Sequence, residues 1–501
     1  MKAKVKRQKK KSNGEAGQRG SHQRRIDESR AVYYLLTFAF AFPKGRATAS
    51  GTLATARGTV LNFRLVNFDE SVSYLLSLGH ETIAVKLGLE NVARLLARLG
   101  DPQASFPSVQ IAGTNGKGST AAMLESVCRA AGLRVGLYTS PHLVSMRERV
   151  RVGGREIGRE EFARAATVVR AAAEEVARES QALPTFFEQV TAIALVAFRE
   201  ERVRLAILET GLGGRLDATT AARASTVAVT PVALDHQEYL GHTLALIAAE
   251  KAAIIRRGVR AVVAPQEPEA EAVIMRRCRE CNVEPRRATG DIEVEEVCEG
   301  GRLRVSLRTA RDVYAGVCLA LRGRHQLTNA VVAVALAESL AEDGFPITRE
   351  HVACGLETAE HAGRLELDAR SDPAILLDGA HNPAGARALR QYLDEFAGGR
   401  VTLIFGAMRD KALAEIASAL FPAAARLILT EPRNPRAATV AELLRAVPVP
   451  PPSSTIALAP SSADALAIAR AQTPRGGTVC VTGSLYLVGE VKALLEDGED
   501  F

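Results

Sequence analysis

A glycine-rich loop, IAGTNGKGST at residues 111–120, constrains the fold of this chain more than any other feature. It stands between a short apolar run and a segment with helical spacing, so it predicts a strand, a tight turn and a helix in that order. Gly113, Gly116 and Gly118 let the backbone turn sharply enough for successive N–H groups to face phosphate oxygens. The loop therefore predicts a site for a nucleotide triphosphate.

The side chains of the loop agree with that prediction. Lys117 supplies a positive charge for the outer phosphates, and Ser119 or Thr120 offers a hydroxyl near a metal ion. A helix from about Ser119 to Ala131, ended by Gly132, would add its positive N-terminal end. The nucleotide-binding residues expected in this loop are Gly113, Thr114, Asn115, Gly116, Lys117, Gly118 and Ser119.

The spacing of the loop is unusual. In the common G-x-x-x-x-G-K-[ST] pattern, a glycine would stand at Ile111 and a hydroxyl residue would follow the lysine, where this chain has Gly118. The alternative interpretation is a glycine turn that binds nothing. Because a lysine among the glycines has little structural purpose, we favour the phosphate site.

Length and charge limit the class of protein. A chain of 501 residues, 47% hydrophobic and 24% charged, is long enough for two or three globular domains. The net charge of +7 is misleading, because residues 1–30 alone carry +8 and the rest of the chain carries −1. A nearly neutral body gives no indication of nucleic-acid binding.

The cysteine pattern indicates reduced thiols in a cytoplasmic enzyme, because their number is odd and their spacing is scattered. Cys278 and Cys281 form a C-x-x-C, but no second pair or nearby histidine supports zinc. The seven cysteines are Cys128, Cys278, Cys281, Cys298, Cys318, Cys354 and Cys480.

Residues 1–66 are expected to be a basic, disordered N-terminal extension. The apolar run at 31–42 is too short to span a bilayer, although with the small residues Ala47–Gly51 it faintly imitates a secretory signal. The phosphate loop and the free cysteines argue against export. We therefore favour a segment upstream of the functional start and predict a cytoplasmic protein without a membrane partner.

Two α/β domains are expected, at 67–366 and 371–501, with a break around 360–373. Apolar runs that alternate with helical patterns predict mainly parallel sheets, so the fold class is a P-loop ATPase domain followed by a smaller Rossmann-like α/β domain. The strand-rich segment 282–318 is interpreted as an antiparallel edge of the first domain, and PVPPP at 448–452 as a rigid loop. The clearest expected elements are strands at 133–139, 205–210 and 225–230 and helices near 160–178, 188–200, 243–255 and 326–341.

Polar residues follow three of the predicted strands. Ser140 follows the first, Glu209 ends the second, and His236 follows the third. Parallel sheets place ligands at their carboxyl ends, so these side chains are expected beside the phosphate loop. A hydroxyl and a carboxylate suit Mg²⁺ and the phosphates that it bridges, and imidazole is a less typical ligand.

Four further residues are candidates in the second half of the chain. Lys251 lies inside an apolar helical run, where spacing alone favours a paired or snorkelling lysine. Arg364 lies at the domain break, and Asp378 and His381 follow the first strand of the second domain. Two domains joined by a short linker would place a ligand cleft between them.

Ten of these strings together resemble one family, the folylpolyglutamate synthases and dihydrofolate synthases of the Mur ligase superfamily. The resemblance runs from about Phe68 to the C-terminus, and the ten strings stand in family order, which makes it specific. Two departures are modest: Thr220 stands where the family has Asn, and GRL at 363–365 replaces GRF. The strings are GTNGKGST, TSPHL, TFFE, ETGLGGRLDAT, ALDH, EKAAI, GRHQLTNA, AGRLE, DGAHNP and VTGSLY.

The resemblance implies an ATP-dependent amide ligation. A pteroate or folate carboxylate would attack the γ-phosphate of ATP, and L-glutamate would displace the phosphate from the resulting acyl phosphate. By motif, Asn329, Arg364 and Asp378 would join the loop in holding ATP, and Ser140, Glu209 and His236 would serve magnesium at two sites.

The resemblance also assigns residues to the acceptor and to catalysis. Lys251 matches a lysine that is carbamylated in the family, which replaces our first interpretation of this residue. With Lys117, the implied catalytic residues are Lys251, His381 and Arg149, the last two near the incoming glutamate, where Ser484 also lies. The implied pterin-contacting residues are Thr185, Phe186, Phe187 and Glu188.

TFFE at 185–188 is similar to the pterin-contacting stretch of enzymes that use dihydropteroate as well as folates, so we expect a bifunctional enzyme. We also expect it to be a monomer that acts on small-molecule substrates. Three alternatives stay open: a purely polyglutamylating enzyme, a ligase of UDP-muramoyl precursors, and a non-catalytic folate- or ATP-binding protein. TSPHL and GLGGRLDAT argue against the muramoyl ligase, and the presence of Lys117, Glu209, His236 and the other motif residues argues against loss of turnover.

Overall fold

The computed structural model describes residues 50–54, 60–64, 66–79, 88–398, 401–446 and 455–497. The chain divides into two units, one that ends at Leu65 and one that begins at Val66. In the first unit, β1 (Ser50–Ala54) pairs antiparallel with β2 (Val60–Arg64), where the sequence had predicted disorder. The apolar run at 31–42 and the proline-rich loop at 448–452 lie outside the described residues. Within the described part of the chain, no helix is long and apolar enough to cross a membrane.

An eight-stranded sheet forms the centre of the second unit, within the described residues. Its strand order is β10-β9-β8-β3-β7-β4-β5-β6, parallel from β10 to β4 and antiparallel at β5 and β6. The central strands are buried along their whole length, as expected of a parallel sheet covered on both faces. The strands are β3 (Ser108–Ala112), β4 (Val135–Tyr138), β5 (Val150–Val152), β6 (Arg155–Glu156), β7 (Leu205–Glu209), β8 (Thr226–Val229), β9 (Arg260–Val263) and β10 (Arg286–Arg287).

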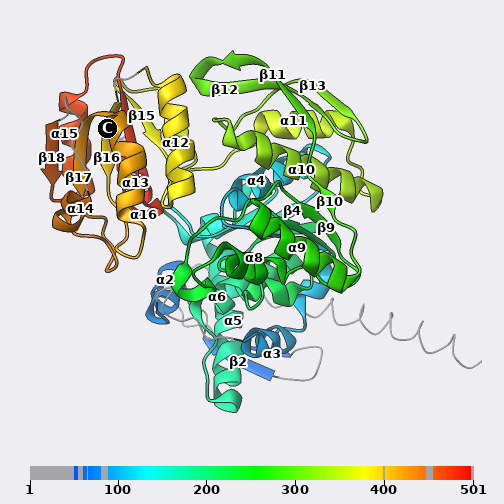
Figure 1. Cartoon of the computed structure of the whole chain (residues 1–501). Helices are drawn as coiled ribbons and strands as arrows, with labels where there is room; N and C mark the ends of the chain where they lie inside the picture. The colour runs from blue at the N-terminus through cyan, green and yellow to red at the C-terminus, as the bar shows by residue number, and fades with distance from the viewer. Residues whose placement is uncertain are drawn as a thin grey trace, which may run out of the picture. The chain divides into compact units, whose positions relative to one another are not determined.

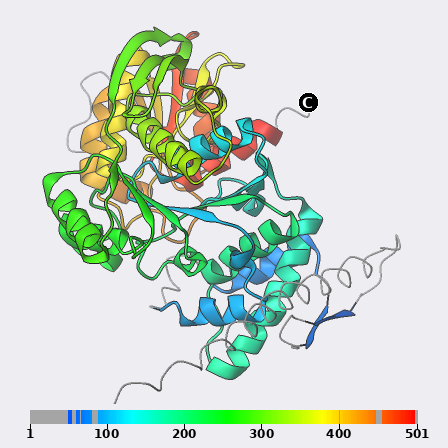
Figure 2. The same cartoon turned by 90° about the vertical axis from the view of Figure 1, so that its right-hand side faces the viewer.

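Helices cover both faces of this sheet (Figures 1 and 2). Val109 and Ile111 of β3 face one core with α4 and α10, whereas Val227 and Val229 of β8 face another core with α8 and α9. Figure 2 shows α2 and α3, in blue, beside the long α5. The helices are α2 (Phe68–Ser77), α3 (Glu90–Arg98), α4 (Lys117–Ala130), α5 (Arg159–Ser180), α6 (Phe186–Glu200), α7 (Gln237–Leu240), α8 (Leu244–Ala252), α9 (Pro268–Cys281), α10 (His325–Glu342) and α11 (Arg349–Thr358).

The segment 282–318 differs from its prediction. Its strands β11 (Asp291–Cys298), β12 (Arg302–Arg308) and β13 (Val313–Cys318) are antiparallel, but they form a separate three-stranded sheet. Only the short β10 joins the edge of the large sheet, and it does so in parallel. The reason is tertiary: Leu303 and Val305 of β12 are buried in the core shared with α4 and α10.

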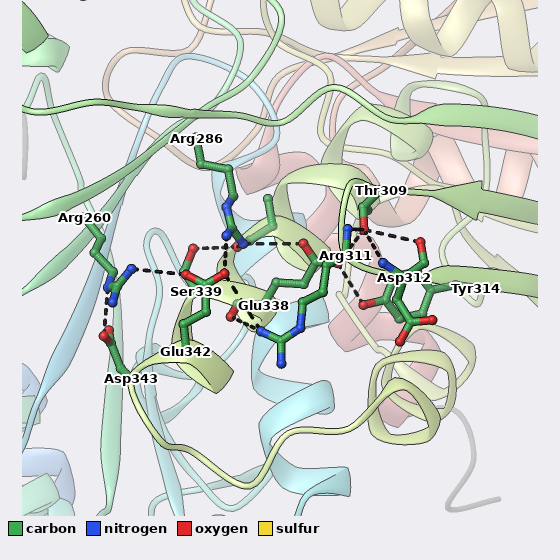
Figure 3. Close-up of polar contacts among 11 residues, drawn as sticks. Arg260, Arg286, Thr309, Arg311, Asp312, Tyr314, Glu338, Ser339, Glu342 and Asp343 are labelled. Atoms are coloured by element: carbon green, nitrogen blue, oxygen red, sulfur yellow. Dashed lines mark hydrogen bonds and ion pairs between the residues drawn. The ribbon is translucent and has the colours of Figure 1, made fainter.

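Buried and half-buried charges attach this small sheet to α10 (Figure 3). Glu338 of α10 accepts hydrogen bonds from Thr309 Oγ1 at 2.6 Å and from the Tyr314 hydroxyl at 3.0 Å. Arg286 of β10 contacts the same carboxylate, with a shortest N–O separation of 3.4 Å. One buried acid thus holds the small sheet, α10 and the edge of the large sheet together, which steadies α10.

The C-terminal part is a six-stranded sheet in the order β14-β15-β19-β16-β17-β18, parallel except for β14. Helices α12 and α13 pack on one face and α15 and α16 on the other (Figure 1). The predicted fold class is confirmed. The elements are β14 (Glu366–Asp368), β15 (Ala374–Leu377), α12 (Pro383–Phe396), β16 (Val401–Phe405), α13 (Leu413–Leu420), β17 (Ala424–Thr430), α14 (Val440–Ala446), β18 (Thr455–Ala459), α15 (Ser462–Gln472), β19 (Thr478–Thr482) and α16 (Leu485–Asp497).

Candidate functional site

The glycine-rich loop joins the end of β3 to the start of α4, as predicted. Helix α4 begins at Lys117, two residues earlier than expected, and Gly116 precedes it with a left-handed φ of +86°. A β-carbon at Gly116 would lie 2.1 Å from Asn329 Oδ1, so any larger residue would fill the loop. The first N–H groups of a helix have no acceptor inside the helix and point toward an anion placed at its start. The loop and α4 therefore fit a phosphate group.

Two backbone N–H groups of the loop have another role. The N–H groups of Thr114 and Asn115 donate to the carbonyl oxygen of Pro231, at 3.0 and 3.2 Å. Thr114 Oγ1 also donates to the carbonyl oxygen of Ala233 at 3.0 Å. These two residues therefore fix the loop onto the chain that follows β8. The N–H groups suited to phosphate are those of the first turn of α4, a narrower set than the sequence predicted.

Lys117, Ser140 and Glu209 come together beside the loop. Ser140 donates its backbone N–H to Glu209 Oε2 at 3.1 Å, and Lys117 Nζ donates to the carbonyl oxygen of Thr114 at 3.2 Å. Burial raises the pKa of the Glu209 carboxyl, and the charge of Lys117, the Ser140 N–H and the charge of Arg364 oppose that shift. The Glu209 carboxyl group thus lies at the end of β7 beside two cationic side chains.

Lys251 lies on α8, and its side chain reaches the phosphate loop. Its side chain is 4% exposed, and Nζ donates to the carbonyl oxygen of Gly113 at 2.8 Å. Burial and, to a smaller extent, the charge of Lys117 lower the pKa of Lys251 to about 7, and Asp235 and Asp217 act in the opposite direction. A large fraction of this amine is therefore neutral near physiological pH.

The predicted metal residues lie around one cavity of about 320 Å³, which the phosphate loop, Lys251 and Arg364 also line. Ser140, Glu209 and His236 all reach it. In the described part of the chain there is no cluster of three or more His, Cys, Asp or Glu that would enclose a metal ion. Mg²⁺ is commonly held by one or two carboxylates together with phosphate oxygens and water, so a single glutamate with a serine hydroxyl fits its chemistry.

The remaining predicted nucleotide residues line the other end of this cavity. Asn329 lies on α10, and its Nδ2 donates to Gln326 Oε1 at 2.8 Å. Asp378 accepts the backbone N–H groups of Leu365 and Ala380, both at 3.0 Å. Burial raises the pKa of Asp378, and the charge of Arg364 opposes the shift. These residues belong to both α/β halves, so the cavity lies between them.

A group of residues around Asp235 was not found from the sequence. Asp235 accepts hydrogen bonds from Lys411 Nζ at 2.7 Å and from Asn382 Nδ2 at 3.2 Å, and His381 Nε2 lies 3.6 Å away. Burial would raise the pKa of Asp235, but the hydrogen bond and charge of His381 and the charges of His236 and Lys411 outweigh burial and lower it. The sequence could have indicated Asp235 as a site residue, because it adjoins His236 in the ALDH motif. No motif around Lys411 indicated a role in the site.

A second cavity, of about 470 Å³, adjoins the first. Thr185, Phe187 and Glu188 of the predicted pterin-contacting stretch line it, and so does Ser484. Thr185 also begins α6 in a capping box, in which its hydroxyl accepts the Glu188 N–H and the Glu188 carboxylate accepts the Thr185 N–H.

Three predicted residues, Gly113, Phe186 and Arg149, do not line either cavity. Phe186 is 3% exposed and packs in the core, with the Arg149 guanidinium 5.4 Å from the centre of its ring. Arg149 is itself 2% exposed and donates from Nε to His142 Nδ1 at 2.8 Å. Phe186 and Arg149 are therefore buried residues that support the cavity wall from inside the protein.

The two cavities share a wall, which is the main geometric feature of the site. Ser140, His236 and His381 line both of them, as do Pro141 and Leu485. A group bound in the second cavity could therefore place one end against the outer phosphate of a nucleotide bound in the first.

Comparisons with known proteins identify the family of this chain. Residues 111–337 match the Mur ligase middle domain, and residues 363–485 match the glutamate ligase domain of the Mur ligases. The dihydrofolate synthase/folylpolyglutamate synthase of Bacillus subtilis is 33% identical over 424 residues, which cover 83% of this chain and 97% of that protein. The chain belongs to the dihydrofolate synthase/folylpolyglutamate synthase family of Mur ligases.

Other relatives extend the comparison. A probable bifunctional folylpolyglutamate synthase/dihydropteroate synthase of Halobacterium salinarum is 38% identical over 435 residues, 85% of this chain. The chain spans about half the length of this relative and of its Haloferax volcanii counterpart. Among solved structures, Escherichia coli FolC in complex with DHPP and ADP has a TM-score of 0.76 and 31% identity, covering 87% of this chain and 99% of FolC. Mycobacterium tuberculosis folylpolyglutamate synthase with ADP has a TM-score of 0.76 and 32% identity, covering 85% and 98%.

Proposed function

We propose that this protein ligates L-glutamate, at the expense of ATP, to dihydropteroate and to folates that already carry glutamate. ATP would occupy the cavity beside the phosphate loop, and the pteroate would occupy the cavity lined by Thr185, Phe187 and Glu188. The substrate carboxylate would then attack the γ-phosphate, and the amine of glutamate would displace the phosphate from the acyl phosphate. The product is an amide, ADP and inorganic phosphate.

The observation that carries this proposal is the shared wall of the two cavities. Ser140, His236 and His381 line both, so a carboxylate in one cavity and a phosphate in the other would adjoin the same wall. Such a reaction depends on positioning and charge neutralisation, since the protein forms no covalent bond to the substrate. Lys117, from the start of α4, is placed to neutralise the phosphate that is transferred.

We propose that Ser140, Glu209 and His236 would hold magnesium with the phosphates. The ion would neutralise phosphate charge when it is bound. Glu209 suits this role because it is a carboxyl group that lines the nucleotide cavity, and Lys117 and Arg364 oppose the rise in its pKa that burial causes. His381, whose Nδ1 lies 2.7 Å from the carbonyl oxygen of Gly379, has its ring orientation fixed from the second half of the chain and would face the incoming glutamate.

A carbamate on Lys251 is part of the proposal. The Lys251 ammonium first loses a proton, and the neutral amine then adds to carbon dioxide with loss of a second proton, so that an anion replaces a buried cation. The burial of Lys251 and its pKa of about 7 supply the neutral amine that this addition needs. The carbamate would lie beside His236 and the phosphate loop. Without it, the magnesium ion would face the positive charge of the Lys251 ammonium.

Glutamate-dependent release of ADP tests the proposal. The two acceptors are 7,8-dihydropteroate and a reduced folate monoglutamate, each product being identified by its mass. Turnover with both acceptors supports the bifunctional assignment, and turnover with the folate alone makes this a polyglutamylating enzyme. If neither acceptor is turned over while ADP still binds, the proposed ligation is wrong and a non-catalytic binding protein becomes the better explanation.

A further inference from the structure

His361 lies in the segment between α11 and β14 that joins the two α/β halves, and its ring rests against the phosphate loop. Its Nδ1 is 3.1 Å from Ser119 Oγ, although 242 positions separate the two residues in the chain. A β-carbon at Gly118 would lie 2.6 Å from Cε1 and 2.8 Å from Nε2 of the same ring. The linker histidine therefore touches both the hydroxyl and the backbone of the first turn of α4.

The hydrogen bonds around Ser119 define which group donates. Gln326 donates from Nε2 to Ser119 Oγ at 3.3 Å. The orientation of that amide is set by Asn329, whose Nδ2 donates to Gln326 Oε1 at 2.8 Å. Because the Ser119 oxygen already accepts one hydrogen bond, its own proton is free to point at His361 Nδ1.

The state of the imidazole agrees with that direction. Burial lowers the pKa of His361 to about 3, and the nearby charges of Arg364 and Arg151 act in the same direction. A neutral ring keeps one nitrogen with a lone pair, which can accept from a hydroxyl. A cationic ring would donate from both nitrogens and could not do so.

We propose that His361 is a positioning residue that accepts the hydrogen bond of the Ser119 hydroxyl and so turns the remaining lone pair of Ser119 Oγ toward the phosphates and their metal ion. This inference rests on the proposed nucleotide site. A hydroxyl can bind a cation only through a lone pair, so its proton must have another acceptor. The contact also explains why glycine follows Lys117, since the ring occupies the space that a side chain at Gly118 would need.

The proposal has a consequence for the coupling between the two halves. His361 stands three positions before Arg364, and Arg364 lines the nucleotide cavity from the linker. The linker thus contacts the nucleotide site twice, once through the Ser119 hydroxyl and once through the guanidinium. A nucleotide that requires the Ser119 lone pair will favour the linker conformation in which His361 is in place.

Two substitutions separate the hydrogen bond from the volume of the ring. In His361→Asn, the amide oxygen replaces Nδ1 as an acceptor, whereas His361→Phe keeps a ring of similar size without an acceptor. Binding of ADP with Mg²⁺ is measured by calorimetry on the full chain, without any acceptor substrate. We expect His361→Phe to weaken binding by roughly 3- to 10-fold, the value of one hydrogen bond, and His361→Asn to stay within about 2-fold of the native affinity.

Steady-state kinetics provide the second readout. In His361→Phe, KM for ATP should rise in proportion to the loss of affinity, while KM for the pteroate acceptor stays unchanged. His351→Gln is the matched control, because His351 lies on α11 in a capping box with Thr348, where glutamine is also suitable. In a Ser119→Ala background, His361→Phe should have no further effect on ADP binding, since the hydroxyl that it positions is absent.

Equal affinities for His361→Phe, His361→Asn and the native protein would overturn the proposal, and so would an undiminished effect of His361→Phe in the Ser119→Ala background. Thermal unfolding establishes that each variant is folded. If His361→Phe does not fold, His361→Ala, which removes both ring and acceptor, replaces it with the same expected loss. If the native protein itself binds no ADP, the proposed function fails, which is a different result from equal binding by all variants.

Discussion

Lys411 Nζ lies 2.7 Å from Asp235 Oδ1 and forms a buried ion pair between the two α/β halves of the protein. The two side chains are 9% and 7% exposed. Asn382, from the same half as Lys411, donates to the other oxygen of the carboxylate at 3.2 Å. Because His236 and His381 adjoin this carboxylate and line both cavities, the pair fixes the two walls of the site relative to each other.

Lys411→Met should therefore reduce both stability and ligation. Removal of one partner leaves a buried charge, and the expected loss of stability is about 3 kcal/mol, since Asp235 keeps its contact with Asn382. The ligation rate should fall by about 10-fold or more, because the cavity walls lose their alignment. Urea unfolding and the rate of ADP release measure the two effects.

Arg324→Ala is the control for that substitution. Arg324 and Glu395 also join the two halves, but their side chains are 36% and 28% exposed. An exposed pair contributes at most about 1 kcal/mol, so both measurements should change little. Equal losses in the two variants would mean that contact between the halves, rather than the buried pair at the cavity, controls the rate.

Lys117→Ala should abolish measurable ligation. The lysine is the cationic side chain at the start of α4, and loss of one preorganised charge at a phosphoryl group typically lowers the rate by about 100-fold or more. Product formation with each acceptor is the measurement. Lys492→Met serves as the control, because Lys492 pairs with Glu366 and does not line the nucleotide cavity. Ligation retained in Lys117→Ala would contradict the assignment of this loop.

A carbamate on Lys251 predicts rescue by small acids. Lys251→Ala should be inactive and should regain part of its activity when acetate or another short carboxylate fills the space beside Gly113. In the native protein, ¹³C-labelled bicarbonate should give a carbamate resonance that is absent from the variant. Absence of both the resonance and any rescue would leave Lys251 as an amine that donates to the loop.

The local parts of the site were predictable from the sequence, because a strand, a glycine turn and a helix are encoded by neighbouring residues. The order of Ser140, Glu209 and His236 after three strands also placed them together, since parallel strands end on one edge of a sheet. The small sheet β11-β12-β13 shows the limit of this reasoning. The strand-rich sequence indicated antiparallel strands, but which core buries Leu303 and Val305 depends on α4 and α10, which lie elsewhere in the chain.

Contacts between distant positions account for the residues that sequence reasoning missed. His361 and Ser119, like Lys411 and Asp235, meet only after the two halves have folded and the linker has been placed. Spacing alone also could not assign Lys251, because a lysine in an apolar helix looks the same whether it snorkels to the surface or is buried, as it is here. Phe186 and Phe187 are adjacent in sequence, and only the direction of α6 separates a core residue from a cavity residue.

Phe186 and Phe187 provide a matched pair of substitutions. Phe187 lines the second cavity, and its ring lies where a β-carbon at Gly211 would come within 2.5 Å. Phe187→Ala should raise KM for dihydropteroate by about 10-fold or more and leave KM for ATP unchanged. Phe186→Ala should instead lower stability by about 3 kcal/mol, because that ring is 3% exposed in the core. An unchanged KM for dihydropteroate in Phe187→Ala would remove the pteroate from this cavity.

The stability of the folded protein should fall as the pH is lowered from about 6.5 toward 3, partly because of His361. Burial lowers the pKa of this imidazole to about 3 in the folded state, whereas an ordinary histidine in the unfolded chain titrates near 6.5. Between these values the unfolded chain binds a proton that the folded protein does not, so the free energy of unfolding decreases as the pH decreases. His361→Phe removes this contribution, and its urea midpoint should change less between about pH 7 and about pH 5 than that of the native protein. Equal changes in the two proteins would mean that His361 binds its proton in the folded state as readily as in the unfolded state, which would contradict a neutral ring beside Ser119.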